Sequence, residues 1–172
     1  TDWRWLTSEK VRPATNAEPA LWRAQGHGLD ILCATSLAIS PADPRIMYFG
    51  YMDVQLWKSP DGGQSIFPVK SLGFNRGNTV ECIALDKDRP EVLFLSVKKP
   101  GAAMGGAIRK TVDGGHNFSP IANRSSGLDE RARISSIEFD YQSPRDRRVM
   151  FAGLFTTQKN PDLRPGIFRS ED

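Results

Sequence analysis

An all-β fold built from repeated four-stranded sheets is the fold class that the sequence predicts, and two observations lead to it. One short box occurs three times, running from an apolar strand through a basic residue, a hydroxyl residue and any residue to an aspartate. The copies span residues 56–67, 108–118 and 167–172. Two short apolar runs joined by a polar turn precede each box, and no long stretch has helical periodicity. Such repeats are typical of stacked or radial folds.

The spacing of the repeat gives the size of its unit. Leu37, Ile83 and Ile137 occupy matching positions, which are 46 and 54 residues apart. A four-stranded propeller blade has about 40–50 residues, so we expect a β-propeller fragment of about three four-stranded blades. The expected blades are residues 30–70, 78–121 and 132–172, the last of them incomplete, with residues 1–29 as the end of a preceding blade. The whole chain, 1–172, is thus predicted to be a partial propeller.

Each blade is expected to hold its strands in the same order, from the axis outward. The first two strands flank a polar turn, the third leads into the box, and the fourth follows the box turn. The first two strands of the three blades are expected at residues 37–40 and 46–50, 83–86 and 92–96, and 137–140 and 149–153. After the box turn an aromatic residue, Phe67 or Phe118, is expected to pack between neighbouring sheets.

The box has the composition of a braced turn. An aspartate carboxylate can accept hydrogen bonds from backbone N–H groups that a tight turn leaves without partners. Glycines tolerate positive φ, and a Ser or Thr hydroxyl can hold the other side of the turn. We therefore predict a structural role for the box residues, which are Ser59, Asp61, Gly63, Thr111, Asp113, Gly115, Ser170 and Asp172.

The two complete boxes, S-P-D-G-G-Q-S-I and T-V-D-G-G-H-N-F, resemble Asp-box (BNR) repeats. Such repeats occur in sialidase-like, sortilin-type and xyloglucanase-type (glycoside hydrolase family 74-like) propellers. Residues 28–172 are most similar to the last group, whose recurring blade resembles Gly28-Leu29-Asp30-Ile31 and Gly50-Tyr51-Met52-Asp53-Val54. This resemblance implies a glycoside hydrolase that cleaves a polysaccharide such as a β-glucan or xyloglucan.

Antiparallel strands separate the loops into two faces. The box turns and the turns between first and second strands share one face, because both lie at the same end of the strands. The opposite face collects the longer and less repetitive loops, at residues 26–32, 51–55, 71–79, 98–106, 123–133 and 156–165. Functional residues are commonly carried by such loops on a regular scaffold, so ligands are expected on this second face.

Asp53 is the candidate catalytic residue. It follows the second strand of the first blade, where the other blades read Ser96-Val97-Lys98 and Leu154-Phe155-Thr156, without a carboxylate. The resemblance implies that two aspartates in a D-(I/V)-G-G setting, contributed by different propellers, act as general acid and general base. Here Gln55-Leu56 replaces the Gly-Gly pair. The alternative role for Asp53 is to cap a hairpin.

Other residues are candidates for substrate binding on the same face. Tyr51 and Phe74 have rings that suit the apolar faces of sugars, and Asn75 and Arg76 lie beside Phe74. His27 and Asp30 lie in another crossing between blades.

Composition limits the remaining possibilities. The net charge of +3 is spread along the chain, which favours solvated loops over a nucleic-acid surface. No apolar run is long enough for a membrane span, and no cofactor fingerprint or metal constellation is present. Cys33 and Cys82 are expected to be two buried free thiols.

Three blades do not close a ring, so the partners expected are further blades or a second propeller of the same protein, together with a glycan substrate. The second catalytic carboxylate is expected outside this chain. An extracellular or periplasmic location would suit such a substrate. Two alternatives stay open: a non-enzymatic, sortilin-like propeller that binds a protein or glycan, and a sialidase-like exo-glycosidase.

Overall fold

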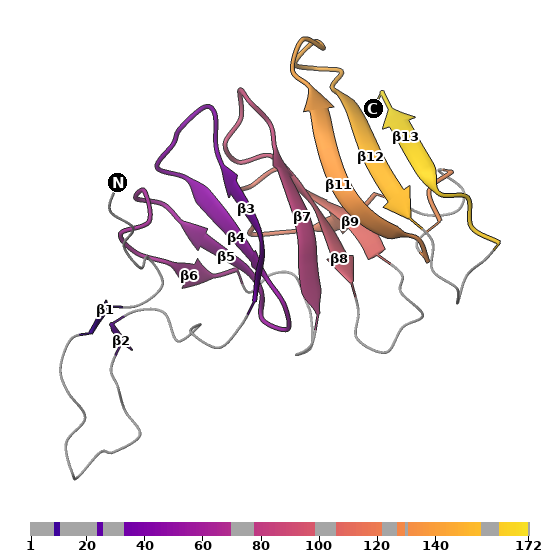
Figure 1. Cartoon of the computed structure of the whole chain (residues 1–172). Helices are drawn as coiled ribbons and strands as arrows, with labels where there is room; N and C mark the ends of the chain where they lie inside the picture. Colours follow the sequence, from indigo (N-terminus) through magenta and orange to yellow (C-terminus); the bar gives the residue numbers. More distant parts are fainter. Residues whose placement is uncertain are drawn as a thin grey trace, which may run out of the picture.

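The computed structural model describes residues 9–10, 24–25, 33–69, 78–98, 106–121, 127–129, 131–155 and 162–171. These residues form β-strands, turns and irregular structure, and none of them is helical. No helix that could cross a membrane is therefore found among them. Figure 1 shows three antiparallel sheets arranged side by side in the order of the chain, with a short pair of strands, β1 (Glu9–Lys10) and β2 (Ala24–Gln25), near the N-terminal end.

Within each sheet the strands follow one another along the chain, and each pairs with the next. We call the sheets blades 1, 2 and 3. Blade 1 consists of β3 (Ala34–Ile39), β4 (Met47–Tyr51), β5 (Gln55–Ser59) and β6 (Phe67–Pro68). Blade 2 consists of β7 (Thr79–Leu85), β8 (Leu93–Lys98), β9 (Gly106–Thr111) and β10 (Ser119–Pro120). Blade 3 consists of β11 (Arg133–Asp140), β12 (Val149–Phe155) and β13 (Gly166–Ser170).

The blades stack through their first strands. β7 packs against β3 and β4 on one side and against β11 on the other. Each blade is a simple antiparallel meander, and neighbouring blades meet face to face, as expected for sheets arrayed about an axis. The predicted fold class is thereby confirmed: the chain is an all-β propeller fragment of about three blades.

Burial on both faces explains the sequence of the middle blade. Successive side chains of a strand point to opposite faces, so Leu93, Leu95 and Val97 of β8 join the core shared with blade 1. Phe94 points the other way, into the core shared with blade 3. A strand covered on both sides reads as a continuous apolar run, and β8 is buried along nearly its whole length.

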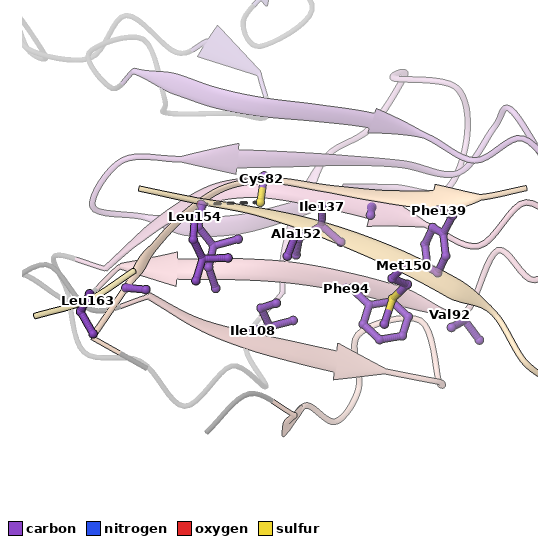
Figure 2. Close-up of a cluster of buried hydrophobic side chains, with 13 residues drawn as sticks. Cys82, Val92, Phe94, Ile108, Ile137, Phe139, Met150, Ala152, Leu154 and Leu163 are labelled. Carbon is purple, nitrogen blue, oxygen red and sulfur yellow. Dashed lines mark hydrogen bonds between the residues drawn. The ribbon is translucent and has the colours of Figure 1, made fainter. Parts of the chain in front are cut away.

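The core between blades 2 and 3 is drawn in Figure 2. Phe94 and Ile108 approach from blade 2, while Met150, Ala152 and Phe139 approach from blade 3. The rings of Phe94 and Phe139 meet edge to face with centroids 5.4 Å apart. Burial of each of the larger side chains, Phe94, Ile108, Phe139 and Met150, contributes about 1.5–3 kcal/mol, so the interface is a major source of stability.

The two outermost faces of the fragment expose apolar side chains. The residues at the matching positions of other blades are buried. Ile167 in β13 is 82% exposed, whereas its counterparts Leu56 and Ile108 are 1% and 6% exposed because the next blade covers them. On the opposite side Leu37 is 60% exposed, while its counterpart Ile137 is 4% exposed. Each of these faces therefore matches a face that a neighbouring blade covers elsewhere in the chain.

A buried ion pair joins blades 2 and 3 near the turns between their first and second strands. Arg148 donates from Nε to Asp86 Oδ2 over 3.0 Å, and Arg89 donates to the same oxygen over 2.9 Å. Asp88 also contacts Arg148. Burial raises the pKa of the Asp86 carboxyl, but the hydrogen bonds from Arg89 and Arg148 outweigh it and hold the pKa below its usual range.

Two details differ from the sequence predictions. Phe67 is 56% exposed, and the residue packed under the first box turn is Ile66, which is 4% exposed. Ile66 and Phe118 both lie five positions after the box aspartate, so the buried position is fixed by the turn and not by residue type. Cys82 is buried as expected, whereas Cys33 is exposed; both thiols are free.

Candidate functional site

The box turns are held by their own side chains. Asp61 Oδ1 accepts from the Ser65 backbone N–H (2.8 Å) and from the Ser59 hydroxyl (2.9 Å), and Ser59 Oγ accepts from the N–H of Gly63 (2.8 Å). The second box repeats the pattern: Asp113 Oδ1 accepts from the N–H of Asn117 (2.9 Å) and the hydroxyl of Thr111 (2.6 Å). The Gly115 N–H donates to Thr111 Oγ1 over 3.1 Å.

These hydrogen bonds account for both aspartates without a ligand. Hydrogen bonds from Ser65 hold the pKa of Asp61 below its usual value, and those from Thr111 and Asn117 do the same for Asp113. The turn glycines are required by backbone conformation, since Gly63 has φ of 88° and Gly115 has φ of 97°. Both observations support the structural role proposed for the boxes. Ser170 ends β13, and Asp172 lies outside the described residues.

Each box turn is also tied to the turn between the first two strands of its blade. The N–H of Gly62 donates to the carbonyl of Arg45, and the N–H of Gly114 donates to the carbonyl of Glu91, both over 2.8 Å. Both kinds of turn therefore lie at one end of the sheets, which we call the box end. Asp53 lies at the opposite end, the hairpin end, separated by the length of β4.

Asp53 lies in a three-residue hairpin loop, Met52-Asp53-Val54, and is exposed. Its φ is 64°, a left-handed conformation that Asp tolerates better than most residues. The loop is anchored at both sides: the Met52 N–H donates to the carbonyl of Cys33 over 3.0 Å, and the ring N–H of Trp57 donates to the carbonyl of Val54 over 3.2 Å. The turn thus presents this carboxylate to solvent from a fixed backbone.

Gln55 stands where the D-(I/V)-G-G pattern that the sequence resembles has a glycine, and its φ is 72°. This conformation favours glycine, so the hairpin has the backbone geometry that a glycine would also adopt. Asp53 therefore keeps its place in the turn with glutamine at position 55.

The other predicted binding residues divide into two groups. Tyr51 is 3% exposed and belongs to a buried cluster with Phe49 and Ile66, so its ring supports the sheet beneath the hairpin instead of offering a face to a sugar. The remaining predictions, Phe74, Asn75, Arg76, His27 and Asp30, lie outside the described residues and stay predictions.

A feature that sequence reasoning missed is a β-bulge at the same place in each first strand. The pairing register shifts at Thr35 in β3, at Glu81 in β7 and at Ser135 in β11. Bulges leave one residue outside the ladder and redirect its side chain, and they are common beside active sites. All three lie toward the hairpin end, because the residues before them pair with Tyr51, Val97 and Leu154. Two of the bulge residues carry a hydroxyl group and the third is a glutamate, so residue type alone does not mark the bulges in the sequence.

Glu81 is the acidic residue among the three, and both of its carboxylate oxygens are paired with Arg133. Arg133 donates from Nε to Glu81 Oε2 over 2.8 Å, and its Nη2 lies 2.7 Å from Oε1. The guanidinium carbon of Arg133 lies 4.8 Å from the centre of the Phe155 ring. This bidentate pair with a stacked ring joins blades 2 and 3 at the hairpin end. No group of His, Cys, Asp and Glu able to hold a metal ion occurs in the described part of the chain.

No family model matches the chain, and neither does any curated protein. Solved structures do resemble it. A GH74 enzyme from Niastella koreensis is 21% identical over 70% of this chain and 17% of its own length, with a TM-score of 0.52. The GH74 xyloglucanase from Xanthomonas campestris is 19% identical over 78% of this chain and 20% of its own length, with a TM-score of 0.56.

YCF48 from Cyanidioschyzon merolae is 14% identical over 81% of this chain and 37% of its own length, with a TM-score of 0.51. Identities this low show a shared fold alone. The chain spans about a fifth of the length of the GH74 structures that it matches. We conclude that the chain is a piece of a β-propeller similar in fold to these proteins.

Proposed function

We propose that this chain is part of a glycoside hydrolase that cleaves a polysaccharide of the β-glucan or xyloglucan type, with Asp53 as one of two catalytic carboxylates. The observation that carries the proposal is the position of Asp53: an exposed carboxylate on an anchored turn at the hairpin end. The carboxylates of the two box turns, by contrast, accept hydrogen bonds from the backbone of their own turns. The likeness in fold to GH74 enzymes supports the same proposal.

The mechanism proposed is hydrolysis with inversion. It requires one carboxyl group to protonate the leaving oxygen and another to activate water, with about 6.5–9.5 Å between them. Asp53 supplies one of these groups. Glu81 is not its mate, because both of its oxygens are held by Arg133. The second catalytic carboxylate belongs to another blade or to a second propeller.

Hydrolysis is tested with the protein that carries this chain together with its remaining blades. Xyloglucan, mixed-linkage β-glucan and unrelated microbial polysaccharides are incubated with it, and new reducing ends are measured. D53N should reduce turnover by about a hundredfold to ten-thousandfold while leaving the urea unfolding curve unchanged, because general acid–base catalysis typically contributes about 10²–10⁴ in rate. The matched control is D43N, which alters an aspartate paired with Arg45 at the box end and should leave turnover unchanged. Unchanged turnover of D53N would remove Asp53 from the mechanism.

The alternative is a non-enzymatic propeller that binds a protein or glycan through the hairpin end. The stacked Arg133 and Phe155, with Lys98 at the end of β8, favour this alternative. It predicts retained binding without new reducing ends, and loss of binding in R133A but not in D53N. A sialidase-like exo-glycosidase has no specific observation in its favour among the described residues. An extracellular or periplasmic location is part of the proposal, since such polysaccharides lie outside the cytoplasm.

A further inference from the structure

Blade 1 departs from the repeat at two residues that lie in one hairpin. β4 and β5, neighbouring strands in Figure 1, are joined by three residues, whereas residues 99–105 separate β8 from β9. Trp57 in β5 stands at the position that Arg109 and Phe168 occupy in the other blades, since each pairs with the matching residue of its second strand. Asp53 and the indole of Trp57 are therefore both particular to this short hairpin.

Asp53 is the central residue of a γ-turn. The Val54 N–H donates to the carbonyl of Met52, two positions back, over 2.8 Å, and φ of Asp53 is 64°. A γ-turn with positive φ at its centre is the rare and strained form. Strained backbone of this kind persists only where surrounding contacts hold it, and it is frequent at active sites. The turn that carries Asp53 therefore depends on support from its neighbours.

Two neighbouring segments supply this support. On one side the Met52 N–H donates to the carbonyl of Cys33, the residue before β3, over 3.0 Å. On the other side the indole N–H of Trp57 donates to the carbonyl of Val54 over 3.2 Å. The first contact joins two backbone groups, whereas the second depends on a side chain. Trp57 is thus the support that a substitution can remove.

The indole is itself held in place by packing. Trp57 and Val54 both pack against the buried cluster of Phe49, Tyr51 and Ile66. The ring of Tyr51, which is 3% exposed, belongs to this packing beneath the hairpin. A side chain whose conformation is fixed by packing can fix the group to which it donates, and functional groups are held precisely in this way.

We propose that Trp57 is a positioning residue for Asp53. Its indole N–H holds the carbonyl of Val54 and so maintains the strained turn and the direction in which the Asp53 carboxylate points. This inference rests on the proposed catalytic role of Asp53 and adds a second residue to that site. A displacement of about 1 Å can cost about a hundredfold in rate, because an acid or base transfers its proton over a hydrogen-bond distance.

The kinetic test is W57F in the protein that carries this chain together with its remaining blades, because phenylalanine keeps an aromatic ring but removes the donor. With xyloglucan as the substrate, we expect kcat to fall about tenfold to a hundredfold and KM to change by less than about twofold. Added to D53N, the same change should lower the residual turnover by less than about twofold. Residues that act as a unit have non-additive effects, so this second result identifies Asp53 as the residue through which Trp57 acts.

Two further measurements separate positioning from a loss of packing. I66V removes a methyl group from the same cluster and leaves the hydrogen bonds of the turn intact, so it should lower the urea midpoint without changing kcat. Hydrogen exchange, followed by mass spectrometry, should be faster in W57F at residues 51–57 and unchanged in β11. If W57F does not fold, benzothienylalanine at position 57 keeps the size of the indole and removes only the N–H, with the same expected results.

Failure of this inference is distinguishable from failure of the proposed function. Unchanged exchange at residues 51–57 in W57F would overturn the role of Trp57 alone. An unchanged kcat in W57F, when D53N removes most of the turnover, would do the same. A further tenfold loss when W57F is added to D53N would also overturn it, because Trp57 would then act by another route. Full turnover by D53N would overturn the proposed role of Asp53 and this inference with it.

Discussion

Arg148 offers a sharp test of how the blades are joined. Its side chain is 5% exposed, and that of Asp86, its partner in blade 2, is completely buried. R148M keeps the packing of the stem but removes the bonds to Asp86 and to the carbonyl of Ser143, the latter 2.6 Å long. Breaking a buried pair while leaving one charge in place costs about 3–5 kcal/mol.

The structure places R148M at the lower end of this range. Asp86 would still accept from Arg89 (2.9 Å) and from the N–H of Asp88 (2.9 Å), so we expect a loss of about 3 kcal/mol in the free energy of unfolding. Urea unfolding at pH 7, followed by tryptophan fluorescence, measures the loss. R147M is the matched control, because Arg147 is 72% exposed and should change stability by less than about 0.5 kcal/mol.

The pH dependence of the same variant checks the electrostatic cause. The pKa of Asp86 is lowered in the folded chain, so its contribution is complete above the unfolded value of about 3.9 and is lost as pH falls toward the folded value. The gap in stability between the wild type and R148M should therefore stay constant from pH 7 to about pH 4 and narrow as pH falls below that. A loss below about 1 kcal/mol at pH 7, or a gap that widens in acid, would refute this explanation.

Three further changes have defined outcomes in the same urea assay. Q55G should raise the free energy of unfolding by about 0.5–1 kcal/mol, because it relieves a left-handed residue at some cost in chain entropy; destabilisation would contradict this. G50A should lower it by about 1–3 kcal/mol, because a Cβ there would lie 2.9 Å from Val80 Cγ1 in the next blade; a neutral result would show that the blades can separate. D113N should lower the urea midpoint at pH 7, and by less as pH falls below about 4, since the contribution of Asp113 is lost between its unfolded pKa of about 3.9 and its lower folded pKa; an effect that stays constant down to about pH 2 would argue against a charged acceptor.

The strands were predictable because local signals agreed with one another. The boxes marked the third strand and its turn, and the apolar runs before them marked the first two strands, as β4 and β8 show. The separation of the two ends followed from antiparallel pairing alone, and the bonds from Gly62 and Gly114 confirm which turns share an end.

Features that depend on distant residues were not predictable. Arg148 and Asp86 are far apart in sequence, as are Arg133 and Glu81, and neither pair forms a local pattern. The bulges arise from how two strands align, which the residue types at Thr35 or Ser135 do not reveal. The choice of Phe67 over Ile66 as the buried residue was wrong because aromatic character was weighed above distance from the box aspartate.

We propose that ligands bind at the hairpin end and that the box end has a structural role alone. The most direct measurement is a crystal structure of the protein with its remaining blades, soaked with a xyloglucan oligosaccharide. We predict density for sugar rings beside Asp53, at the end where the bulges of β3, β7 and β11 lie. Sugar bound against the turns of Asp61 or Asp113 would contradict the proposed division between the two ends.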